Sequence, residues 1–254
     1  MRTRPLRRTG RHLALLLTTA LGLSTLTTLT AAPHATAARG PVVPHGLKGE
    51  YYTQSAPGAF DFGKLKATGF DPNIDFGSLE SRLQTATGQS DNASVRWTGK
   101  LVPEKTGSTT FSIIGDNGFR LWVGGRLVID HWVDDWDKEQ TSRPVELKAD
   151  DAVDIKVEYF EHIGGSNLHL RWTEPGERKT PIPASAFRLP DDWKYDGAIG
   201  TTVLGDGRTL KLDFAQKLGR VPGGANGHVS AVIGGSKWPL SRVKADPHDP
   251  RALL

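Results

Sequence analysis

Residues 115–132 read GDNGFRLWVGGRLVIDHW, and this stretch decides the fold of the chain. A run that alternates apolar and polar residues, 119–123, and an apolar run, 127–129, flank the pair Gly124-Gly125. Alternation with a period of two is typical of a β-strand with one buried face, and a Gly-Gly pair is typical of a two-residue hairpin turn. The stretch therefore predicts a β-hairpin with a polar loop, 115–118, at its mouth.

Similar short runs continue on both sides of this hairpin. The clearest is 152–159, where four apolar residues alternate with Asp154, Lys156 and Glu158, so that one face is buried and the other is in water. Leu168, Leu170 and Trp172 alternate in the same way, which predicts a second hairpin with residues 161–167 as its loop. The predicted strands are 46–52, 94–101, 109–114, 119–123, 126–130, 145–148, 152–159 and 168–172. Short strands at this spacing predict an all-β fold, an antiparallel β-sandwich or barrel.

The N-terminal segment has the composition of an export signal. Five arginines precede an apolar run over residues 13–23 and a stretch of small residues that ends near Ala37 and Ala38. We expect residues 1–38 to be a bacterial-type secretory signal peptide, so that the working protein is extracellular. The apolar run is shorter than the ~20 residues that a membrane span needs, so no membrane insertion is expected.

Removal of this segment changes the charge balance. The five arginines account for more than the whole formal charge of +4, so the remaining chain carries a net charge of −1. This removes the compositional support for nucleic-acid binding. The chain has no cysteine, so neither a disulfide nor a lipoprotein anchor is expected.

A second, smaller region follows the predicted sandwich. Residues 191–200 are predicted to be a linker, and residues 209–214 and 228–233 are strand candidates separated by 219–227. Few apolar positions are available here, so the core of this region is expected to be marginal. We expect 201–254 to be a small, truncated β module of immunoglobulin-like type.

Five motifs occur in the order of one known family: HGLKGEYY at 45, SVRWTGKLVPEKTG at 94, the 115–132 stretch, VDIKVEYFEHIGGSNLHLRW at 153 and TPIPASAF at 180. Over residues 45–190 the chain resembles the PA14 domain. That family is named for a fragment of anthrax protective antigen, and it also occurs in flocculin and adhesin lectins and as an insert in glycosidases. The resemblance implies an antiparallel β-sandwich.

In its lectin members the resemblance further implies a calcium ion that coordinates sugar hydroxyls. Two successive aspartates joined by a cis peptide hold the ion, together with groups from a later loop. This chain has Asp116-Asn117 at the position of the aspartate pair, and Glu161 and His162 lie near the later loop. Oxygen ligands of this kind suit calcium, so Asp116, Asn117 and Glu161 are the candidate metal ligands.

Each candidate also has a simpler interpretation. Asp116-Asn117-Gly118 is composed of residues that form turns for local reasons. Asp134, Asp135 and Asp137 form either a second acidic site or a solvated loop, and Trp136 among them is a candidate platform for a sugar ring. Trp193 is a platform or a linker residue. We expect Trp97, Trp122, Trp132 and Trp172 to be packed in the core.

Catalysis has little support in this sequence. No Gly-x-Ser-x-Gly, His-Glu-x-x-His or Gly-rich phosphate motif is present, and no pair of carboxylates can be assigned to glycoside hydrolysis. We therefore expect a secreted, non-catalytic, lectin-like module that binds a glycan or polysaccharide through Asp116, Asn117, Glu161, His162 and Trp136. The alternatives are a structural module with a protein partner and an accessory fragment of a larger glycan-active enzyme.

Overall fold

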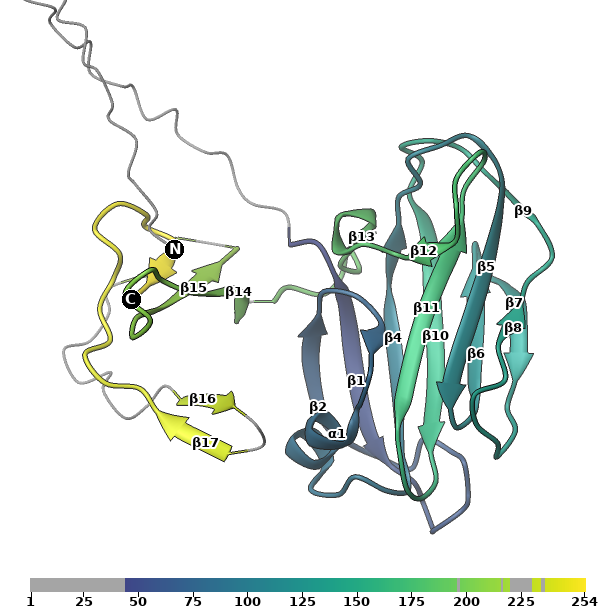
Figure 1. Cartoon of the computed structure of the whole chain (residues 1–254), viewed down its shortest axis with the longest axis horizontal. Coiled ribbons are helices and arrows are strands. Elements are labelled where there is room, and N and C mark those ends of the chain that lie inside the picture. Colours follow the sequence, from purple (N-terminus) through teal and green to yellow (C-terminus); the bar gives the residue numbers. More distant parts are fainter. Residues whose placement is uncertain (1–43, 196, 216, 220–229, 234–235) are drawn as a thin grey trace, which may run out of the picture. The chain divides into compact units, whose positions relative to one another are not determined.

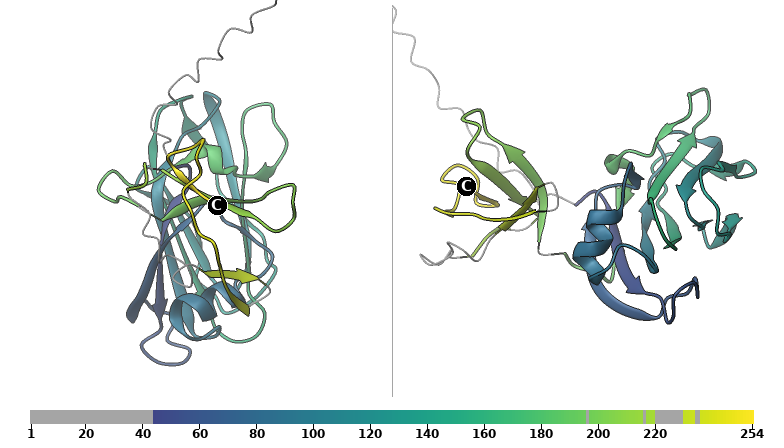
Figure 2. Two further views of the ribbon diagram at one scale, coloured as in Figure 1. Left: turned by 90° about the vertical axis from the view of Figure 1, so that its left-hand side faces the viewer. Right: turned by 60° about the horizontal axis from the view of Figure 1, so that its bottom comes forward.

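The computed structural model describes residues 44–195, 197–215, 217–219, 230–233 and 236–254. The predicted signal peptide and most of the predicted separator 219–227 lie outside the described residues. The part from residue 44 to residue 195 forms two facing antiparallel sheets, seen from three directions in Figures 1 and 2. The predicted all-β sandwich is therefore confirmed.

The larger sheet has seven strands and contains the predicted hairpin. In spatial order they are β2 (Lys64–Asp71), β1 (Leu47–Thr53), β4 (Ala93–Leu101), β10 (Val153–Glu161), β6 (Phe119–Val123) and β7 (Arg126–His131), with β13 (Phe187–Arg188) paired to β4. Gly124 and Gly125 make the turn between β6 and β7, and both have a positive φ, 56° and 75°. Glycine adopts such angles without the steric cost that a Cβ brings, which explains the Gly-Gly pair.

The smaller sheet has six strands. They are β12 (Thr180–Pro181), β11 (Asn167–Thr173), β5 (Gly107–Asp116) and β8 (Gln140–Thr141) in spatial order, with β3 (Asp75–Phe76) on β11 and β9 (Val145–Leu147) on β5. A short 3-10 helix, η1 (Ala184–Ala186), leads into β13.

The core lies between the two sheets and follows the predicted alternation. In β10 the residues Ile155, Val157 and Tyr159 are buried in the core, whereas Lys156 on the opposite face is only half-buried. Trp97 and Trp172 are core residues, as predicted. All eight predicted strands are present, with ends that differ by one or two residues.

Two predictions within the sandwich are wrong. β10 and β11 do not form a hairpin, because β10 pairs with β4 and β6 whereas β11 pairs with β5 in the other sheet. Residues 161–167 are therefore an arch that connects the sheets. Trp122 and Trp132 are not core residues either, since both are half-buried on the outer side of the larger sheet. Trp122 alternates with the core residues Leu121 and Val123, and this alternation turns it outward.

The segment between β1 and β4 contains elements that the sequence did not predict. β2, β3 and the helix α1 (Glu80–Thr87) lie here, and α1 contacts β1 and β2 (Figure 1). Asp71 at the end of β2 is fully buried, accepts hydrogen bonds from Tyr51 (2.5 Å) and Trp97 (2.8 Å), and forms an ion pair with Arg82 of α1. This buried network fastens α1 to the larger sheet.

The C-terminal part forms separate small sheets. β14 (Ala198–Val203), β15 (Leu210–Phe214) and β18 (Ala252–Leu253) make one sheet, and β16 (Ser230–Ile233) and β17 (Ser236–Pro239) make a two-stranded ribbon. β15 and β16 fall on the two predicted strands. That 201–254 is an immunoglobulin-like module remains a prediction. None of the described helices has the length and apolar character to cross a membrane.

Candidate functional site

The two loops that the sequence selects lie at one end of the sandwich. β5 ends at Asp116 and β10 ends at Glu161, and both strands run toward the same end (Figure 1). The arch 161–167 then leads into β11, whose first residue, Asn167, is paired directly with Asp116. The peptide bond between Asp116 and Asn117 is cis, as the family resemblance implies for its lectin members.

Asn117 connects the two loops from a buried position. Its side-chain oxygen accepts a hydrogen bond from the backbone N–H of His162 (2.9 Å), and its own backbone N–H donates to the carbonyl of Phe160 (3.3 Å). Gly118 follows closely against the Phe160 ring, where a Cβ would lie 2.2 Å from a ring carbon. These contacts hold the arch against the β5–β6 connection, which is a positioning role.

Glu161 lies beneath the site rather than on its surface. The side chain is fully buried, one carboxyl oxygen accepts a hydrogen bond from the Tyr159 hydroxyl (2.7 Å), and the other has no partner among the described residues. The Tyr159 hydroxyl also contacts the carbonyl oxygen of Asp116. Burial raises the pKa of Glu161 to about 8; the Tyr159 hydrogen bond opposes this rise, and the Asp116 carboxylate adds to it.

Asp116 is half-buried and stands among other acids. Burial raises the pKa of its carboxyl group, and the negative charges of Asp137 and Asp134 raise it further. The ion pairs of the described residues include none to Asp116, so its charge has no cationic partner there. A desolvated acid with acidic neighbours favours a bound cation or a hydrogen-bond donor.

The acidic loop around Trp136 belongs to this same site. Trp136 forms a backbone bridge with Asp116, and the N–H of Asp137 donates to the carbonyl of Gly115 (3.1 Å). From the sequence, this loop was interpreted as separate from Asp116, either as a second acidic site or as a solvated loop. The predicted hairpin could have placed this loop near Asp116. A two-residue turn returns β7 beside β6, so the residues after β7 must lie at the end of the sheet where β6 begins.

Trp136 and His162 form the rim of the site. Trp136 is 66% exposed, as expected for a platform, and His162 pairs through Nδ1 with Asp134 (2.9 Å). The His162 ring also lies edge-on against Phe60, which stacks on Phe160. Phe60 was missed because it occurs in a segment, 54–63, that has no strand pattern.

The structure thus brings together all five predicted site residues and adds Asp134 and Asp137. Within the described part of the chain, no three His, Cys, Asp or Glu side chains converge closely enough to share one metal ion. Any cation at Asp116 would therefore need backbone carbonyls, water or ligand oxygens to complete the six to eight positions that calcium prefers.

Comparisons with known proteins agree with this architecture. The curated anti-sigma-I factor RsgI3 of Acetivibrio thermocellus is 37% identical over 147 residues, which make up 58% of this chain and 22% of that protein. A solved structure described as an anti-sigma factor domain-containing protein is 34% identical with a TM-score of 0.54, and the match covers 62% of this chain and 52% of that chain. This chain thus spans less than a quarter of the curated relative and about half of the solved one.

A third match is a solved PA14 sugar-binding domain from an RTX adhesin. It is 22% identical with a TM-score of 0.47, and the match covers 57% of this chain and 99% of that chain. The family model of the PA14 domain matches residues 44–186, which is more than half of the sequence and agrees with the predicted 45–190. The chain therefore belongs to the PA14 domain family.

Proposed function

We propose that this protein is an exported, non-catalytic module that binds a glycan at the end of the sandwich where Asp116 and the arch 161–167 meet. The observation that carries the proposal is the half-buried Asp116 carboxylate, which has no ion-pair partner among the described residues and whose backbone bridges to that of the exposed Trp136. Sugars present hydroxyl donors at their edges and C–H groups on their faces. An acidic centre with an aromatic rim complements both.

The residues of the site divide into contact and positioning roles. Asp116, with Asp134 and Asp137 close by, supplies the acceptor oxygens, and Trp136 supplies the apolar platform. Asn117 and Glu161 are buried beneath, where Asn117 fixes the backbone of His162 and Glu161 supports Tyr159. Their burial favours positioning over direct contact with a sugar, whereas their predicted role as metal ligands stays a prediction.

Calcium assistance is part of the proposal. The donors fit a hard cation, because Asp116 offers a carboxylate whose negative environment opposes its ionisation and would be relieved by positive charge. Calcium bound there would supply open coordination positions for sugar hydroxyls. The chain's own contribution is to hold Asp116 and the carbonyls of the arch in fixed positions.

The test uses the full chain without the predicted signal peptide, residues 39–254. We expect calorimetry to show calcium binding that Asp116→Ala abolishes, and a glycan array to show signals that a chelator removes. Asp151→Ala is the matched control, since Asp151 is exposed and lies before β10 at the opposite end of that strand. Calcium and glycan binding unchanged in Asp116→Ala would refute the site.

One observation favours a different function. Val133, Trp136 and Ile163 at the rim are 49%, 66% and 63% exposed, and large exposed apolar side chains near one another also suit a protein partner. If calcium and every glycan fail to bind while a Trp136→Ala, Ile163→Ala variant loses a protein partner captured by the wild type, the protein-interaction module becomes the better proposal.

A further inference from the structure

The outer face of the larger sheet carries rows of polar side chains that strand pairing fixes. Lys156 of β10 is paired with Thr98 of β4 on one side and with Trp122 of β6 on the other. The neighbours of Lys156, Ile155 and Val157, point into the core, so this row points away from the core. The next row, Glu50, Arg96, Glu158, Arg120 and Asp130, alternates in charge across five strands.

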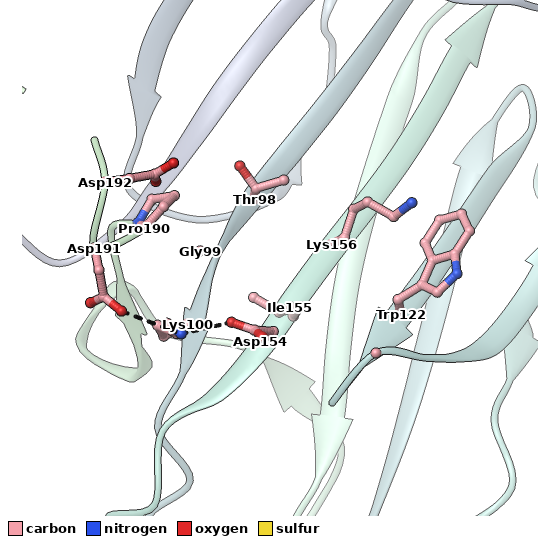
Figure 3. Close-up of a pocket in the computed structure, with 11 residues that line it drawn as sticks. Thr98, Gly99, Lys100, Trp122, Asp154, Ile155, Lys156, Pro190, Asp191 and Asp192 are labelled. Carbon is pink, nitrogen blue, oxygen red and sulfur yellow. Dashed lines mark ion pairs between the residues drawn. The ribbon is translucent and has the colours of Figure 1, made fainter. Parts of the chain in front are cut away.

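An open groove occupies one end of this face (Figure 3). Its volume is about 620 Å³, and its floor is formed by β4, β10 and β6. The segment 190–192 forms one wall of the groove, and Trp122 lies at the opposite side. Ligand sites commonly have volumes of about 300–1,000 Å³, so the groove has the size of a binding site.

Trp122 lies at the edge of this groove and contacts Lys156. The ammonium group of Lys156 lies 3.6 Å from the centre of its ring, a cation–π contact. The ring is half-buried and lines the groove, and the Lys156 ammonium covers one of its faces (Figure 3). A rigid indole on a sheet face provides apolar area without a large loss of side-chain entropy on binding.

The charged groups of the groove nearly cancel one another. Lys100 pairs with Asp154 at 2.8 Å and with Asp191 at 3.5 Å, and Lys156 is engaged by Trp122. Asp192 adds one further carboxylate. The groove therefore offers hydrogen-bond donors and acceptors on both sides without an excess of positive charge that would attract a polyanion.

We propose that this groove is a second glycan site, which binds a neutral pyranose polysaccharide by packing against the Trp122 indole and by hydrogen bonds to Lys100, Asp154 and Asp191. A polyanion would find no lysine in the groove lining that is free of a partner, because Lys100 and Lys156 are both engaged. A protein interface would require an apolar centre larger than one indole. Because the groove is open, it can bind sugar units in the middle of a polysaccharide as well as at its end, which suits a polymeric ligand.

This site is separate from the Asp116 site. Lys156 and Glu161 are five residues apart on β10, so the two sites lie about 17 Å from each other along one strand. The groove contains neither Asp116 nor any other candidate calcium ligand. Binding there is independent of calcium, and the inference stands even if the Asp116 site proves to bind nothing.

The experiment is affinity electrophoresis of residues 39–254 in chelator, with xyloglucan, mixed-linkage β-glucan and galactomannan as neutral probes. Polygalacturonate and chitosan serve as the anionic and cationic comparisons. We expect retardation by at least one neutral polysaccharide, and an affinity about tenfold lower for Trp122→Ala, which corresponds to about 1.4 kcal/mol. Trp122→Phe should keep part of the affinity, because it keeps an aromatic ring.

Leu127→Ala is the matched control, because Leu127 is the exposed cross-strand neighbour of Trp122 but does not line the groove. Its affinity should equal that of the wild type. If Trp122→Ala does not fold, as judged by circular dichroism, the indole N–H resonance of Trp122 in the wild type replaces it and should shift on titration with the retarding probe.

Three results would overturn the proposal: no neutral polysaccharide retards the chain in chelator, Trp122→Ala binds as tightly as the wild type, or only polygalacturonate or chitosan binds. Retardation in chelator that Trp122→Ala weakens supports glycan binding in the groove, whether or not Asp116 binds calcium or a glycan.

Discussion

Glu161 shows how one buried residue links the two loops of the Asp116 site. Its carboxyl group is fully buried, one oxygen is held by Tyr159, and Tyr159 also contacts the backbone of Asp116. A buried carboxyl avoids the cost of an isolated charge by keeping its proton, which is why its pKa rises to about 8. Near neutral pH most molecules therefore carry a neutral Glu161 side chain.

This shift predicts the pH dependence of stability. The folded protein holds the Glu161 proton more tightly than the unfolded chain does, so the free energy of unfolding falls as pH rises from about 4.5 to about 8. Glu161→Gln, which is always neutral, should remove a decline of a few kcal/mol over that range. Urea denaturation in chelator between pH 4.5 and 8.5 measures it, and identical pH profiles for variant and wild type would contradict it.

Asp71 is the second buried acid with a defined structural task. Asp71→Ala would leave the Tyr51 hydroxyl and the Trp97 indole N–H without their acceptor, and it would remove the ion pair of the Arg82 guanidinium. We expect the free energy of unfolding to fall by about 3–5 kcal/mol, as when one partner of a buried ion pair is removed. Asp75→Ala removes an acid that pairs with His169 at an exposed position and should cost less than about 1 kcal/mol. Equal losses in urea denaturation would refute the role of the buried network.

Among the elements, the strands with regular alternation were predictable and the connections between sheets were not. The run 152–159 and the run 168–172 each show which face is buried, but the inner faces of two different sheets produce the same alternation as two strands of a hairpin. β2 escaped prediction because Lys64, Leu65 and Lys66 are all exposed, so it has no apolar face at its start.

The β6–β7 hairpin provides a test at the scale of an element. Gly124 and Gly125 have no atom within 4 Å of an added Cβ, so a substitution there acts through the backbone alone. Gly125→Ala should lower the free energy of unfolding by about 1–2 kcal/mol, because alanine disfavours a positive φ. Gly77→Ala is the control, since Gly77 has the same open space without a positive φ, and it should be neutral or slightly stabilising. Equal unfolding midpoints in urea for the two variants would count against this account.

At the scale of the whole molecule, much of the Asp116 site could be predicted from the sequence. Asp116, Asn117, Glu161, His162 and Trp136 were selected, and the structure places them at one end of the sandwich. The sequence could not predict which of these side chains are exposed, because the burial of Asn117 and Glu161 depends on how the arch folds over the end of β5. The groove at Trp122 also depends on strand register and on the path of 190–192, neither of which a local pattern reveals.

The core also indicates how the molecule divides. Every residue of the hydrophobic core cluster lies between Leu47 and Phe187, whereas the buried apolar residues described beyond residue 198 are Ala215 and Ala252. Since stability follows buried apolar area, the sandwich should not depend on the C-terminal part. We expect a chain of residues 39–195 to unfold within about 2 °C of the sandwich transition of residues 39–254 in calorimetry. It should also keep its polysaccharide retardation in chelator, because 190–192 remains. A markedly lower transition temperature would show that the C-terminal sheets contribute to the sandwich, and the two regions would then have to be treated as one folding unit.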